Sequence, residues 1–175
     1  MRPIITTLGA AGASPWLRVN SKQIPFDLSF RVTLSSGASM TYQVQHTFDD
    51  PEKRQNCSLS RTTTTATLTL ADHGLAVGDS STVTGAEAPF DGTYAVASVV
   101  DANNITYTVA NSGATSATTD VARVTVFRVS AHATVTGKTA SDDGSQYSAP
   151  VQAIRLNITA YTSGKATLIA LQGGI

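Results

Sequence analysis

The stretch Phe26-Asp27-Leu28-Ser29-Phe30-Arg31-Val32-Thr33-Leu34 decides the fold class, because apolar and polar residues alternate through it without a break. This period of two predicts a β-strand with one buried face. After a turn at 35–38 the alternation resumes over 40–48. We expect these two strands to pair as an antiparallel hairpin. Pro51 should end the second strand, since proline has no N–H to donate to a sheet.

The composition extends this expectation to the whole chain. Thr and Ser are abundant, and charged residues make up only 14% of the 175 residues. Thr and Val pack well on a pleated surface, while Ser, Asn and Gly suit the turns between strands. We therefore predict an all-β protein whose weakly charged surface suits packing against other proteins.

The charge balance and the apolar runs exclude several classes of partner. Twelve basic and twelve acidic residues give a formal net charge of zero, so we expect no nucleic acid partner. The apolar runs are far shorter than the roughly 20 residues of a membrane span, and no secretory signal is recognisable. We expect a soluble chain made in a cytoplasm, with no membrane partner. The single Cys57 cannot form an internal disulfide.

The composition and the spacing of turn residues change near residue 61 and change back near residue 121. Between them, turn signals separate four short candidate strands, at 66–70, 81–85, 93–100 and 105–110. This pattern predicts an inserted small β-barrel-like domain over 61–121. The flanking pieces 15–60 and 122–175 should together form one antiparallel β-sandwich, jelly-roll-like, preceded by an N-terminal arm at 1–14.

Both ends of the chain carry candidate contacts with other proteins. The arm is apolar in places but shows no strand pattern, so we expect it to be either disordered or ordered only by lying on a neighbour. The last strand, 165–172, is apolar on both faces and is therefore central in a sheet or covered by a partner. Trp16 either plugs one end of the sandwich or anchors a contact. The candidate interface residues are Ile4, Ile5, Leu8, Trp16, Leu168, Ile169, Leu171 and Ile175.

No motif in the chain indicates catalysis. The three histidines lack metal-ligand spacing, and Cys57 has no neighbouring histidine to activate it. The acidic pairs Asp49-Asp50 and Asp142-Asp143 are typical of solvated turns. We predict that the protein is not an enzyme, with no catalytic residues, no metal site and no cofactor. The Cys57 thiol is either exposed to solvent or buried as a small packing residue.

Two blocks in the flanking pieces resemble a known class of protein. The most specific are His46-Thr47-Phe48-Asp49-Asp50 and Ala153-Ile154-Arg155-Leu156-Asn157, supported by the stretches 16–19 and 136–140. They resemble small virion structural proteins of tailed bacteriophages, of the capsid-decorating or head-associated kind. The segment between them, with 71–79 and 90–94, is similar to a small β module that recurs in phage tail, baseplate and head proteins.

The resemblance implies a capsid decoration, or cement, protein that stabilises the phage head by bridging major capsid subunits. Its partners would be the major capsid protein and further copies of itself, as a dimer or trimer. It would be made in the host cytoplasm and end on the outer capsid surface of the virion. The alternative is a tail, baseplate or fibre component whose inserted domain contacts host glycan through Thr93-Tyr94 and Ile105–Val109.

Overall fold

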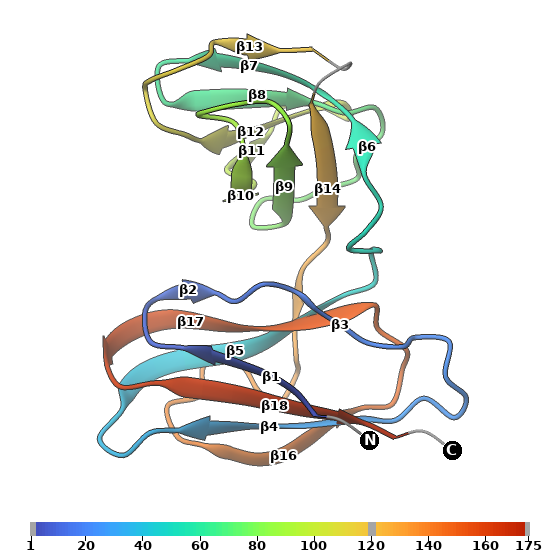
Figure 1. Ribbon diagram of the computed structural model, residues 1–175, viewed down its shortest axis with the longest axis vertical. Helices are drawn as coiled ribbons and strands as arrows, with labels where there is room; N and C mark the ends of the chain where they lie inside the picture. The colour runs from blue at the N-terminus through green and yellow to red at the C-terminus, as the bar shows by residue number, and fades with distance from the viewer. Residues whose placement is uncertain (1–2, 119–121, 174–175) are drawn as a thin grey trace. The chain divides into compact units, whose positions relative to one another are not determined.

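The computed structural model describes residues 3–118 and 122–173, and this part of the chain consists of strands, turns and loops without a helix. All paired strands are antiparallel, which confirms the all-β prediction. In the same residues, no helix has the length and apolar character that crossing a membrane requires. The chain divides into two compact units, Met1–Phe48 with Ser130–Ile175 (unit 1) and Asp49–Val129 (unit 2) (Figure 1).

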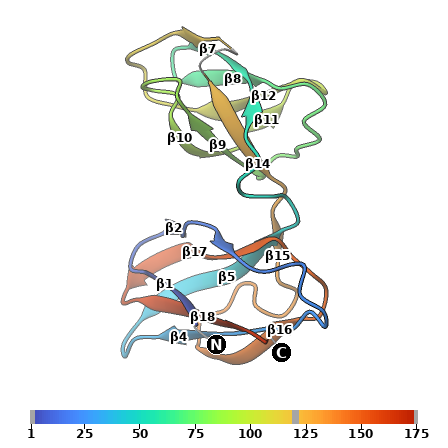
Figure 2. The same cartoon turned by 45° about the vertical axis from the view of Figure 1, so that its right-hand side comes forward.

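Unit 1 contains two sheets that face each other (Figure 2). The first, here called the β18 sheet, has the strand order β1 (Ile4–Leu8), β18 (Ala166–Gln172), β4 (Leu28–Leu34) and β16 (Asp142–Tyr147). The second, here called the β17 sheet, has the order β15 (Ser130–Ala131), β5 (Ser39–Thr47), β17 (Ala153–Ser163) and β2 (Gly12–Ala13), with β3 (Leu17–Arg18) also paired to β17.

The core of unit 1 fills the space between these sheets. Alternate residues of each strand point inward, so β4 contributes Leu28, Phe30 and Val32 while β5 contributes Tyr42 and Val44. The Tyr42 hydroxyl reaches out of this core and donates to the carbonyl of Ala140 at 2.8 Å. Burial is the main cause that raises the pKa of Tyr42 to about 12, and nearby Asp142 adds to it.

The expected hairpin of 26–34 with 40–48 is wrong. Strand β4 lies between β18 and β16 in one sheet, whereas β5 lies between β15 and β17 in the other. The connection at 35–38 therefore crosses from sheet to sheet. An alternating pattern specifies which side chains are buried, and two such strands bury them equally well face to face or side by side.

The expectation that the N-terminal arm has no strand of its own is also wrong. Residues Ile4–Leu8 form β1, which pairs with β18 of the same chain in a continuous register from Ile4 opposite Ala170 to Leu8 opposite Ala166. Ile4 and Leu8 pack against the core, while Ile5 and Thr7 face outward. The arm is thus ordered by its own sandwich.

Unit 2 also has two sheets. One has the order β10 (Gly92–Ala95), β9 (Ser80–Thr84), β14 (Arg123–Phe127) and β6 (Gln55–Asn56). The other, here called the β8 sheet, has the order β11 (Ser98–Val99), β12 (Asn104–Thr108), β8 (Thr65–Thr69), β7 (Ser58–Thr62) and β13 (Ser116–Ala117). The core of unit 2 contains residues of both sheets, with Leu68 and Ile105 from the β8 sheet and Val83 and Val124 from the other.

This arrangement departs from the expected barrel, because neither sheet closes on itself within the described part of unit 2. The boundaries also differ from the expected 61 and 121. Strand β14, which we expected in the sandwich piece 122–175, pairs with β9 inside unit 2, and β7, which spans the expected boundary at 61, pairs there with β8. Both units contain Val- and Thr-rich strands like 124–129, so composition could not show to which unit this strand belongs. The jelly-roll strand order and the status of unit 2 as an insertion stay predictions.

Candidate functional site

The predicted contact residues of the two chain ends come together on the outer face of the β18 sheet. Ile5 is 55% exposed and Leu171 is 43% exposed, and Ile169, directly opposite Ile5, is partly exposed. These three side chains form what we call the apolar stripe. Arg31, opposite Ile169 on β4, borders it. Apolar groups gathered next to one another on a surface are typical of a contact with another protein.

The other predicted contact residues lie elsewhere. Leu168 is fully buried in the core, so a partner cannot reach it in this fold. Ile4 and Leu8 are half-buried and pack against the same core. Ile175 lies outside the described residues. Of the two alternatives for 165–172, a central strand or a strand covered by a partner, the structure shows the first, since β18 lies between β1 and β4.

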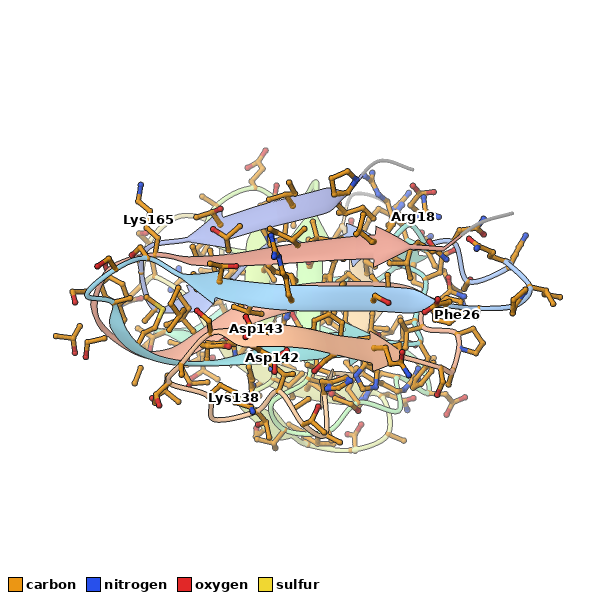
Figure 3. All side chains as sticks on the ribbon, turned by 90° about the horizontal axis from the view of Figure 1, so that it is seen from below. Arg18, Phe26, Lys138, Asp142, Asp143 and Lys165 are labelled. Atoms are coloured by element: carbon orange, nitrogen blue, oxygen red, sulfur yellow. The ribbon has the colours of Figure 1, made fainter. Side chains whose placement is uncertain are left out.

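The two edges of the β18 sheet differ in chemistry. The β16 edge carries Asp142, Asp143 and a register shift before Ser145, which are features that discourage pairing with a further strand (Figure 3). The β1 edge reads Ile-Ile-Thr-Thr-Leu, without charge, proline or register shift, and no strand of the described residues pairs with its outer side. The β1 edge is therefore the one suited to adding a strand from another chain.

A second cluster lies on the β17 sheet, on the face turned away from the core, and we call it the arginine site. Strands β2 and β3 both pair with the edge of β17, and the chain between them leaves the ladder at Ser14. Ser14 N–H donates to the carbonyl of Leu156 at 2.8 Å, and its hydroxyl accepts from the Leu156 N–H at 3.2 Å. Two residues further on, the Trp16 ring and the Arg155 guanidinium are in contact, with 4.3 Å between Cζ of Arg155 and the ring centroid.

Arg155 is the central residue of the arginine site. It is only 8% exposed, and its Nε–H donates to Oε1 of Gln45, directly opposite on β5, at 2.8 Å. Burial lowers the pKa of Arg155 to about 10, which leaves the group charged at neutral pH. Trp16 is half-buried and lies outside the core cluster, which does not fit the first of its two predicted roles, a plug in one end of the sandwich.

Aromatic and histidine rings gather between the β17 and β18 sheets. His46 and His132 both contact the ring of Tyr147, at centroid distances of 5.1 and 4.7 Å, and the Tyr147 hydroxyl lies 3.2 Å from Nδ1 of His46. Burial, and secondarily His132, lowers the pKa of His46. This environment keeps His46 neutral near pH 7 and is consistent with a structural, hydrogen-bonded histidine.

Unit 2 has a polar hollow of about 150 Å³ lined in part by Asp49, Lys53, Asp72 and Arg128. The Arg128 guanidinium is engaged there by Asp49 at 2.6 Å and by the carbonyls of His73 and Gly74. Among residues 3–118 and 122–173, no three His, Cys, Asp or Glu side chains lie close enough to hold a metal ion. The absence of an enzymatic or cofactor role stays a prediction.

Cys57 is fully buried in the core of unit 2, which decides between the two readings of this thiol. Burial raises its pKa to about 11, although nearby Arg123 opposes the shift. We predict that iodoacetamide at pH 8 leaves Cys57 unmodified in the folded protein and alkylates it readily in urea, since only the thiolate reacts. Intact-mass spectrometry measures this, and rapid alkylation of the folded chain would contradict the buried position.

The outer face of the β8 sheet is made of Ser, Thr and Asn. One row crosses all five strands in register through Ser98, Thr106, Thr67, Ser60 and Ser116. Some neighbours bond to each other, such as the hydroxyls of Ser98 and Thr106 at 2.6 Å. Ile105 and Tyr107, suggested above as glycan contacts, are buried on the opposite face, so only the hydroxyl residues of this segment remain available.

In comparisons with known proteins, the chain matches no family model, no curated protein and no solved structure.

Proposed function

We propose that this chain is a structural protein of a tailed-bacteriophage virion, and specifically a capsid decoration protein that stabilises the head by bridging major capsid subunits. The resemblance of 46–50 and 153–157 to such proteins supports the class. In this role the protein lies on the outer capsid surface and contacts both the major capsid protein and its own copies, as a dimer or trimer.

The observation that carries the proposal is the apolar stripe beside the open β1 edge. Ile5 and Leu171 are exposed, so a protein that covers them stabilises the complex by roughly 25 cal/mol per Å² of apolar surface removed from water. The unpaired backbone groups of β1 can at the same time accept a strand from a neighbour. Many weak contacts of this kind, repeated over a symmetric shell, add up through effective concentration.

The substitution Ile5→Lys tests this surface. Ile5 points away from the core, so we expect the fold to survive while attachment to phage heads weakens by at least about tenfold. The measurement is co-sedimentation of purified protein with heads that lack it. Val100→Lys in unit 2 is the matched control, because Val100 is an equally accessible apolar residue, 61% exposed.

Two outcomes would contradict the proposal. The first is wild-type protein that fails to sediment with heads at any concentration used. The second is equal attachment of Ile5→Lys and Val100→Lys, which would mean that the apolar stripe takes no part.

The hydroxyl face of the β8 sheet favours one alternative, a tail, baseplate or fibre component that contacts host glycan. Its Ser and Thr side chains both donate and accept hydrogen bonds, as sugar hydroxyls do. Nanogold labelling of intact particles separates the two functions. Label over the head supports decoration, and label confined to the tail supports the alternative.

A further inference from the structure

The charge of Arg155 on β17 has no carboxylate partner among the described residues. Its side chain is only 8% exposed, and no described Asp or Glu forms an ion pair with it. The strands β15, β5, β17, β2 and β3 of the same sheet contain no Asp or Glu. A buried guanidinium normally has a carboxylate or phosphate partner, because removing a charge from water is costly.

The hydrogen bonds of Arg155 are also incomplete. A guanidinium has five N–H donors in a planar fork. Here Nε–H donates to Gln45, Cζ lies 4.3 Å from the centre of the Trp16 ring, and no residue in 3–118 or 122–173 accepts a bond from the two terminal nitrogens. Gln45 and Trp16 thus fix the orientation of the fork while leaving its outer end unoccupied by the protein's own groups.

We propose that the arginine site binds a carboxylate of a partner protein, an Asp or Glu side chain that takes a two-point hydrogen bond from the terminal nitrogens of Arg155. Such bidentate pairs are planar and specific, and they match the orientation held by Gln45 and Trp16. The choice of a protein partner rests on the proposed function, whereas the carboxylate chemistry rests on the charge and geometry of the site.

The chain supplies its own reporter for this site. Trp16 is the only tryptophan in the 175 residues, and its ring lies 4.3 Å from the Arg155 guanidinium. We expect sodium acetate, titrated into the full chain at constant ionic strength and pH 7, to change Trp16 fluorescence in a saturable way. Sodium chloride should not, and Arg155→Gln should lose the acetate response.

Gln45→Glu provides a second test that does not depend on removing Arg155. It places a carboxylate beside the guanidinium within the chain, so we expect the fold to be kept and the acetate response to disappear. Gln43→Glu is the matched control, since Gln43 lies two residues away on the same face of β5 and should leave the response intact.

Three results would overturn the site: equal responses to acetate and chloride, an acetate response that persists in Gln45→Glu, or a stronger response to phosphate than to acetate. None of these measurements involves phage heads. An acetate response without attachment to heads would therefore reject the decoration function and keep the arginine site. Attachment to heads without an acetate response would reject the arginine site and keep the decoration function.

Discussion

Replacing Leu168 by alanine is expected to lower the free energy of unfolding by about 2–5 kcal/mol, whereas Leu171→Ala should change it by less than about 0.5 kcal/mol. Both leucines belong to β18, but Leu168 is fully buried between the two sheets of unit 1 and Leu171 is 43% exposed on the outer face. The first substitution leaves a cavity in the core, and the second removes atoms that already contact water.

The two variants should also differ in function. Leu171→Ala shortens the apolar stripe, so it should weaken attachment to phage heads while the protein stays folded. Urea unfolding followed by circular dichroism gives the stabilities, and co-sedimentation gives the attachment. Equal losses of stability in the two variants would show that β18 does not have one core face and one contact face.

Alternation in the sequence predicted the burial of individual side chains better than it predicted their neighbours. The inward positions of 28–34 and 40–44 are those that the pattern indicates. The pairing of these strands was missed, because sheet membership depends on partners such as β18 and β17 that follow more than a hundred residues later. Local pattern contains no information on that choice.

The arginine site shows the same limit. Arg155 and Gln45 occupy the polar positions of alternating strands, where solvent exposure is the ordinary expectation. Both are nevertheless buried, and Trp16, remote in sequence from Arg155, lies over its guanidinium. The hydroxyl face of the β8 sheet was missed for a related reason, since the Ser and Thr content was evident but the register that aligns it in rows was not.

The second large effect is expected at Gly164, in the connection between β17 and β18. This connection crosses between the sheets of unit 1 and packs on the crossing at 35–38. Ser35 N–H donates to the Lys165 carbonyl at 2.9 Å, and the Lys165 N–H donates to the Ser35 hydroxyl at 2.9 Å. Gly164 has φ +89°, and a Cβ there would lie 2.5 Å from Cβ of Ala38 and 2.6 Å from its Cα.

We therefore expect Gly164→Ala to lower the free energy of unfolding by about 3 kcal/mol or more, from left-handed backbone strain together with a collision against main chain that cannot move aside cheaply. Gly137→Ala is the matched control in the same unit. It has φ +63°, and no atom of the described residues lies within 4 Å of the added Cβ, so only strain of about 1 kcal/mol should remain.

Urea unfolding of the two glycine variants separates these contributions. Because β17 carries Arg155 and β18 carries Ile169 and Leu171 of the apolar stripe, a disturbed crossing at Gly164 should also reduce both the acetate response of Trp16 and attachment to heads. Equal destabilisation by the two substitutions would mean that the crossings at 35–38 and Gly164 are not in contact. The two proposed binding surfaces would then have to be positioned by the strands alone.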